Sequence, residues 1–315
     1  MSHRFVAFAA VVTAVIAAVS LVPVSIAGQL GGQPNLEGIW TNATITPLER
    51  PQEFAGKEFL TEKEAAEYEK QVGERTNAER RDANAEADLA VGYNDVWWDR
   101  GTRVVSTRRT SIIVDPPDGR VPPLTPEAQK KAAARAEARR LHPADGPEDR
   151  SLADRCIVRG NTGPPMLPAG YNNYYQIVQT PEHVVILIEM IHDARLIPLA
   201  TRPHLPTNVQ QWLGDSLGRW EGKTLVVDTT NFTDKTNFRG SGEHLRVTER
   251  FTRVDEGTLL YQFTVDDPQS FTRPWSGEIP MKKVDGPIFE YACHEGNSSM
   301  ENILRAARAE EKAAQ

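Results

Sequence analysis

Apolar and polar positions alternate through much of the second half of the chain. Over 245–254, Leu245, Val247 and Phe251 are separated by polar residues, and the same period-two pattern recurs over 259–266. Alternation of this kind is typical of a β-strand with one buried face and one exposed face. Eight short segments bounded by Gly, Pro, Asp or Asn, with no helical pattern between them, are predicted as strands: 174–179, 183–191, 195–199, 225–230, 245–254, 259–266, 277–284 and 288–294. Together they predict an antiparallel meander.

The strand pattern predicts a mainly β fold. Two earlier short strands are expected, over 36–41, which contains Gly38 and Trp40, and over 110–114, which stops at a Pro-rich turn. A meander of eight or more strands favours closure into a lipocalin-like β-barrel, and a β-sandwich is the alternative. Residues 184–188 are apolar at every position, which indicates a strand covered on both faces.

Three segments predict peripheral helices rather than core helices, because they are rich in Ala and charged residues. The first begins with Thr61 and has Glu64 three residues later, the pattern of a capping box. The second begins with Thr125 followed by Pro126 at the first helical position. The chain then divides into a flexible lead-in, one β domain with two helical insertions, and a C-terminal helix: 28–36, 37–298 with insertions near 61–86 and 125–141, and 299–315.

The first 27 residues have the three parts of a secretory signal peptide. Arg4 supplies a basic start, residues 5–22 are an almost unbroken apolar run, and small residues lead to a cleavage site at Ala27. The alternative is an uncleaved membrane anchor, but Pro23 and the small residues that follow favour cleavage. We expect a periplasmic or secreted protein that has no membrane segment after cleavage.

The two cysteines, Cys156 and Cys293, are predicted to form a disulfide. An even number of cysteines in a chain sent to an oxidising compartment favours pairing. Two free thiols and a catalytic cysteine are the alternatives.

Charge and missing motifs exclude several function classes. The formal net charge is −7, whereas a nucleic-acid-binding surface needs a concentrated basic patch. The sequence has no Gly-x-Ser-x-Gly, P-loop, Gly-x-Gly-x-x-Gly, His-Glu-x-x-His or Cys-x-x-Cys motif. We therefore expect no nucleic-acid partner and no cofactor.

The densest polar cluster predicts acid–base chemistry. Glu189, His192 and Asp193 are the candidate catalytic residues, because a histidine flanked by carboxylates can move a proton near neutral pH. A metal site is not predicted, because on a strand Glu189 and Asp193 would share one face while His192 points to the other. A structural role, with the histidine bonded to a loop carbonyl, is the competing interpretation.

Aromatic residues beside amides and charges predict ligand binding. Such residues suit a sugar, an aromatic compound or another partly apolar small molecule. The candidate binding residues are Tyr171, Asn173, Tyr174, Arg195, His204, Trp212, Trp220 and His294.

Several stretches resemble a large family of secreted bacterial proteins of unknown function. They are the segments 93–101 (YNDVWWDRG), 163–168 (GPPMLP), 189–195 (EMIHDAR), 218–222 (GRWEG), 272–275 (TRPW) and 291–297 (YACHEGN). The resemblance covers most of the chain after the signal. It implies export and an intact domain, and it assigns no activity or catalytic residue.

Two functions of different classes remain open. The first is an exported barrel that binds a partly apolar or aromatic small molecule. The second is a cofactor-independent lyase, isomerase or hydrolase that uses a histidine and carboxylate pair in the barrel cavity. The sequence leaves the ligand, the presence of catalysis and the oligomeric state undetermined.

Overall fold

The structure is a computed structural model that describes residues 32–79 and 95–313. Residues 34–315 form one compact unit. The predicted signal peptide, 1–27, lies outside the described residues. No helix among the described residues is long and apolar enough to cross a membrane.

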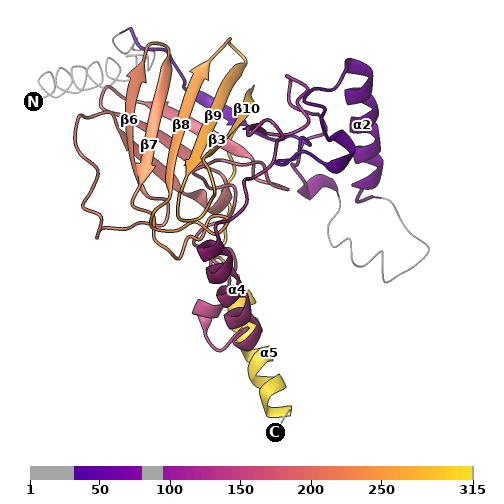
Figure 1. Cartoon of the computed structure of the whole chain (residues 1–315), viewed down its shortest axis with the longest axis vertical. Helices are drawn as coiled ribbons and strands as arrows, with labels where there is room; N and C mark the ends of the chain where they lie inside the picture. Colours follow the sequence, from indigo (N-terminus) through magenta and orange to yellow (C-terminus); the bar gives the residue numbers. More distant parts are fainter. Residues whose placement is uncertain (1–31, 80–94, 314–315) are drawn as a thin grey trace, which may run out of the picture. The chain divides into compact units, whose positions relative to one another are not determined.

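One large antiparallel sheet dominates the described part of the chain (Figure 1). Its strands are β1 (Gly38–Thr41), β2 (Ile113–Asp115), β3 (Tyr174–Gln179), β4 (His183–Ile188), β5 (Ala194–Pro198), β6 (Asp215–Glu221), β7 (Thr224–Thr230), β8 (Arg246–Arg253), β9 (Thr258–Asp266) and β10 (Trp275–Val284). The order is β5-β4-β3-β1-β10-β9-β8-β7-β6, and β2 also pairs with β10. Two meanders are thus joined through β1, which confirms the predicted mainly β fold.

The sheet is not closed by hydrogen bonds. In the described residues β5 pairs only with β4, and β6 pairs only with β7, so no backbone ladder links the two edges. The edges nevertheless come together through side chains: a Cβ added at Gly218 on β6 would lie 2.9 Å from atoms of both Ile197 and Leu199. The predicted closed barrel is therefore not established, and two facing layers, as in the sandwich alternative, fit this open sheet.

The strand patterns explain the core. Along β8, β9 and β10 every second residue is buried, as the period-two alternation requires. These buried faces meet around large side chains that are almost fully inaccessible: Trp40, Tyr175, Phe251, Tyr261, Phe263 and Trp275. Their burial supplies the main hydrophobic stabilisation of the domain.

Three α-helices accompany the sheet in the described residues: α2 (Glu62–Arg75), α4 (Pro126–Leu141) and α5 (Ser299–Ala313). Thr61 and Glu64 form the predicted capping box of α2, which ends eleven residues before the predicted limit of 86. Thr125 caps α4 by accepting a hydrogen bond from the backbone of Ala128. Short 3-10 turns cover Gln52–Phe54, Asp95–Trp97, Pro147–Asp149 and Met190–His192.

Four strand predictions need correction. Residues 288–294 form no strand, because no neighbouring strand pairs with them and Phe289 is 69 % exposed. The strand expected over 183–191 ends at Ile188, where the chain enters the turn Met190–His192. β6 is present although it was not predicted. β4 is buried on one face only, because Val185 and Leu187 are half-buried.

The disulfide prediction is confirmed. Cys156 and Cys293 are bonded, and their Cα atoms lie 5.9 Å apart. The bond joins the irregular segment before β3 to the loop that follows β10, rather than to a last strand. It fixes the segment 148–169 against the C-terminal part of the domain.

Candidate functional site

The space that the sheet encloses is filled with side chains. Arg195 on β5 forms a two-pronged ion pair with Glu249 on β8, and the side chains are 2 % and 0 % exposed. The Tyr261 hydroxyl donates to Glu249 and accepts from the backbone N–H of Met166. Arg195 also donates to Ser216 on β6, so this network ties β5 to both β6 and β8. Arg195, a predicted binding residue, is thus engaged by the protein itself.

The three candidate catalytic residues do not form one constellation. Glu189 is 4 % exposed, whereas His192 is exposed and its Nδ1 lies 2.8 Å from the carbonyl oxygen of Tyr291. Asp193 accepts a hydrogen bond from the next backbone N–H, that of Ala194. The strand reasoning failed here because the chain turns sharply: Ile191 has φ 64° and His192 has φ 46°. A positive φ at a β-branched residue is uncommon and costs energy.

Glu189 instead lies near Asp99 and Tyr174, whose charge and hydroxyl group affect one another's ionisation. Burial raises the pKa of Glu189, and the charge of Asp99 raises it further, against hydrogen bonds from the backbone of Phe289 and the side chain of Asn172. Burial also raises the pKa of Asp99, although Asn173 and Tyr174 donate hydrogen bonds to it. The Oε2 atom of Glu189 is buried and has no partner in the described residues. No basic side chain among the described residues forms an ion pair with Glu189, so a negative charge on this carboxyl group would be uncompensated.

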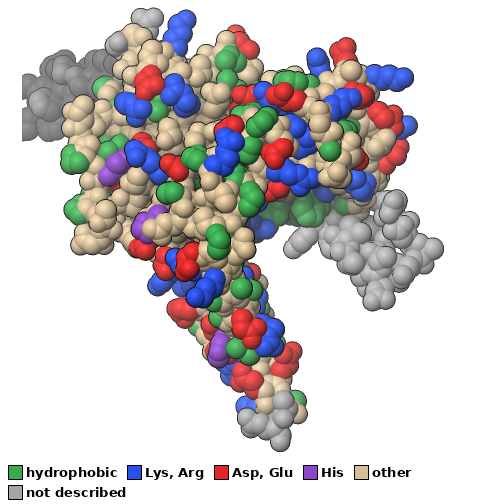
Figure 2. Space-filling model, viewed as in Figure 1, with side chains coloured by type: hydrophobic (Ala, Val, Ile, Leu, Met, Phe, Trp, Pro, Cys, Tyr) green, Lys and Arg blue, Asp and Glu red, His purple; other side chains and the backbone are tan. Residues whose placement is uncertain are grey.

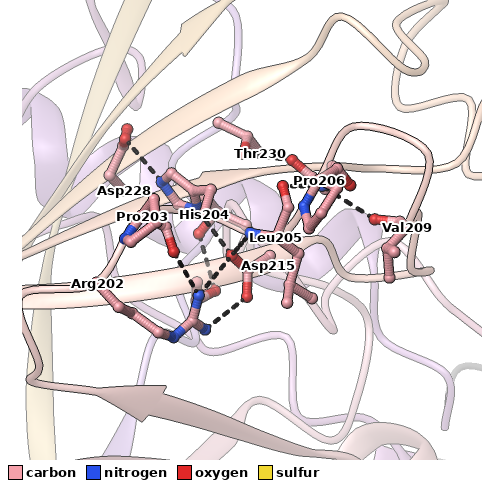
Figure 3. Close-up of polar contacts among 12 residues, drawn as sticks. Arg202, Pro203, His204, Leu205, Pro206, Val209, Asp215, Asp228 and Thr230 are labelled. Atoms are coloured by element: carbon pink, nitrogen blue, oxygen red, sulfur yellow. Dashed lines mark hydrogen bonds and ion pairs between the residues drawn. The ribbon is translucent and has the colours of Figure 1, made fainter.

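His204 lies between two aspartates on the outer side of β6 and β7 (Figure 3). Its Nδ1 is 2.8 Å from Oδ2 of Asp215, and its Nε2 is 3.2 Å from Oδ2 of Asp228. Arg202 makes two hydrogen bonds to Asp215, and Arg246 makes two to Asp228. The cluster fastens the segment that connects β5 and β6 to the sheet.

Electrostatics support this fastening role. Burial alone would raise the pKa of Asp215, but hydrogen bonds from Arg202 and His204 outweigh it and lower the pKa. For Asp228, burial is likewise outweighed by the hydrogen bond and charge of Arg246, with a smaller contribution from His204. Both carboxylates are thus held in the charged form.

Most remaining candidate binding residues also have protein partners. Asn173 is fully buried, donates to the carbonyls of Asp99 and Ala169, and accepts from the backbone of Ala169. Tyr171 packs edge-to-face against Trp98, with ring centroids 6.1 Å apart. The other three are dispersed: Trp220 packs on the core, His294 is exposed after the disulfide, and Trp212 lines a cleft.

The cleft that contains Trp212 has a volume of about 1090 Å³. Its walls come from α4, from the segment 148–169 and from the loop 232–239. Helix α4 contributes one face, with residues spaced three or four apart: Arg135, Ala138, Arg139 and His142. Phe238 provides apolar surface and stacks on Trp275 of the core at 6.3 Å between ring centroids, whereas Phe232 is 1 % exposed and belongs to the core.

Basic side chains are concentrated in this cleft. Seven of its lining residues are Lys or Arg and three are Asp or Glu: Arg135, Arg139, Arg150, Arg155, Arg159, Lys235 and Arg239 against Glu148, Asp149 and Asp234. The chain as a whole is acidic, with a formal net charge of −7. Figure 2 shows both signs of charge interspersed over the visible face. The positive excess of the cleft is therefore a local property.

Sequence reasoning named Trp212 but missed the rest of the cleft. One signal was present: the basic residues at 135 and 139 lie one helical turn apart on the same face of a helix that was predicted. The other walls come from the segment 148–169, which has no regular pattern, and from the loop 232–239, which is distant in sequence. Asp99, which lies beside Glu189, was also missed, although it belongs to the quoted segment 93–101.

No group of three or more His, Cys, Asp or Glu side chains in the described ranges is arranged to hold a metal ion. The family resemblance remains a prediction, as nothing else bears on it. Comparison of the chain with protein-family models, with curated proteins and with solved structures finds no match.

Proposed function

We propose that this is an exported small-molecule-binding protein whose ligand occupies the cleft between α4, the segment 148–169 and the loop 232–239. The observation that carries the proposal is the cleft itself, with a volume of about 1090 Å³. Small-molecule sites are concave, partly apolar and few in each protein. The sequence analysis predicted a ligand in the space that the sheet encloses. That space is occupied by Trp40, Tyr175 and the Arg195–Glu249 pair.

The cleft has the composition of a site for a partly apolar ligand. Phe238 and Trp212 are half-buried and offer aromatic surface, and the polar residues around them offer hydrogen bonds. The disulfide at Cys156 fixes one wall before any ligand arrives. A wall that is already ordered loses little conformational entropy on binding, which favours affinity.

Export and barrel closure belong to the same proposal. The signal-like first 27 residues and the disulfide support a periplasmic or secreted location. The close approach of the Ile197 and Leu199 side chains to the backbone of Gly218 supports a lipocalin-like barrel in which β5 and β6 meet without a backbone ladder. In this arrangement the barrel acts as a filled scaffold and the ligand binds outside it.

Acid–base catalysis is the second candidate function. It is favoured by the buried carboxyl group of Glu189, whose Oε2 atom has no hydrogen-bond partner in the described residues and whose pKa is raised by burial, which favours the protonated form of the group. His192 and Asp193 lie in the adjoining turn and would act on a substrate that reaches this end of the sheet. The two functions differ in where the small molecule binds.

Native mass spectrometry of protein exported to a bacterial periplasm and purified without denaturation tests the binding function. We expect a mass excess over the denatured chain, which identifies a retained molecule. In Ala138→Trp, a bulky ring on the cleft face of α4 should remove that excess. The matched control is Ala133→Trp, because Ala133 is exposed on α4 and does not line the cleft. Retention that both variants leave unchanged would contradict the proposed site.

A further inference from the structure

The basic side chains that line the cleft are only partly compensated by carboxylates. Three of its arginines have carboxylate neighbours: Arg150 lies 3.3 Å from Asp154, Arg155 lies 3.8 Å from Glu148, and Arg239 lies 3.7 Å from Glu49. The last two contacts are long for a hydrogen-bonded ion pair. These arginines are therefore only partly compensated.

Four other basic residues of the cleft have no ion pair with any described carboxylate. Arg135 donates to the neutral amide oxygen of Asn237, and the guanidinium of Arg159 lies 4.9 Å from the ring centroid of Tyr171. Arg139 and Lys235 are exposed at the cleft and have no partner among the described side chains. Two acids of the lining, Asp149 and Asp234, are also outside any such pair, so a basic excess remains.

The four unpaired basic residues come from different walls. Arg135 and Arg139 project from α4, Arg159 belongs to the segment that the disulfide anchors, and Lys235 lies in the loop before Phe238. Positive charges on separate walls attract anionic groups at more than one point of a ligand. Guanidinium groups bind carboxylate and phosphate oxygens with two parallel hydrogen bonds, which favours these groups over other anions.

We infer that the ligand of the cleft is a polyanion: a small molecule with at least two carboxylate or phosphate groups and an apolar part that contacts Trp212 and Phe238. This inference rests on the proposed function, since it names the chemical class of the molecule that the same cleft binds. An oppositely charged cleft on an acidic protein also orients such a molecule as it approaches.

Isothermal titration calorimetry of the folded, disulfide-bonded protein at low salt tests the inference. The probes are citrate and inorganic pyrophosphate, and neutral maltose is the control ligand. We expect one of the two anions to bind and maltose not to bind. The double variant Arg139→Gln/Lys235→Gln should weaken anion binding by at least about tenfold, which corresponds to the loss of about one charged hydrogen bond.

The control is Arg140→Gln, which removes one positive charge from the residue next to Arg139 on α4. Arg140 bonds to Glu137 and does not line the cleft. The affinity of the Arg140→Gln variant for the anion should equal that of the unmodified protein. Equal weakening in Arg140→Gln would show non-specific attraction and overturn the inference, as would the absence of binding by both anions.

The failure of the inference and that of the proposed function are distinguishable. If native mass spectrometry finds a neutral molecule that Ala138→Trp displaces, the cleft binds a ligand but the polyanion inference is wrong. If Ala138→Trp changes neither the retention of a molecule nor the affinity for an anion, the proposed function is wrong as well.

Discussion

Arg195 and Glu249 face each other inside the domain, with Nη1–Oε1 and Nη2–Oε2 distances of 3.0 and 2.5 Å. The two residues lie on β5 and β8, which are not neighbours in the sheet order. A buried ion pair between such strands specifies how the edge strand β5 folds back over the other layer. The ion pair also fills part of the enclosed space in which the sequence analysis predicted a ligand.

Removing one partner of this pair should destabilise the fold strongly. Arg195→Met leaves Glu249 as an unpaired buried charge, which typically costs about 3–5 kcal/mol. The double variant Arg195→Met/Glu249→Leu should recover much of that loss, because it leaves no buried charge. Urea unfolding followed by circular dichroism measures both. Equal stability of Arg195→Met and the unmodified protein would contradict the buried pair.

Reduction of the disulfide should destabilise the fold and weaken the cleft together. Cys156 and Cys293 are 137 residues apart, and closure of a loop of this length restricts the unfolded chain by roughly 5 kcal/mol at most. The variant Cys156→Ser/Cys293→Ser should therefore unfold at lower urea concentration. It should also lose affinity for the ligand of the cleft, because the segment 148–169 is released. Unchanged affinity in a destabilised variant would show that the disulfide does not order that wall.

Acid should destabilise the protein through Asp215 and Asp228. Their pKa values are lowered in the folded state, so each contributes stability above the ordinary value of 3.8 and loses it as the pH falls through the lowered pKa. Thermal unfolding between pH 5 and pH 2 should show this decline. In Asp215→Asn the protein should be less stable at pH 5, and its decline with acid should be shallower. An unchanged slope would contradict the role of the cluster around His204.

Glu189 should have the opposite pH dependence. Its pKa is raised, so its contribution to stability is present below the ordinary value of 4.5 and is lost as the pH rises through the raised pKa. Glu189→Gln keeps an oxygen for the donors from Asn172 and Phe289 and removes the uncompensated charge. We expect it to stabilise the protein at pH 7 and to have little effect at pH 4, as measured by thermal unfolding. Destabilisation at pH 7 would indicate that the charged form of Glu189 is held by interactions not identified in the structure.

The regular strands could be predicted from the sequence, because their alternation directly reflects burial on one face. β6 was missed because Asp215, Ser216 and Gly218 resemble a turn. Gly218 is required there by the close approach of Ile197 and Leu199, which a sequence does not reveal. Residues 288–294 were wrongly predicted as a strand, because an alternation of apolar and polar residues does not show whether a neighbouring strand is present to pair with.

The candidate sites were harder to predict for a related reason. Glu189, His192 and Asp193 are close in sequence, but the turn at Ile191 separates their side chains. The cleft unites α4 with the largely irregular segment 148–169, which follows it closely, and with the loop 232–239, which lies about ninety residues after the end of α4. Their juxtaposition depends on the disulfide and on the packing of Phe238 against Trp275, both of which are tertiary contacts.

The location of the bound small molecule tests the central claim most directly. The measurement is a crystal structure of protein exported to a periplasm, purified without denaturation and crystallised with the anion that binds most tightly in calorimetry. The account predicts electron density for the anion between α4, the segment 148–169 and the loop 232–239, in contact with Arg139 and Lys235. Density beside Glu189 and Asp99, with an empty cleft, would contradict it and favour the acid–base enzyme.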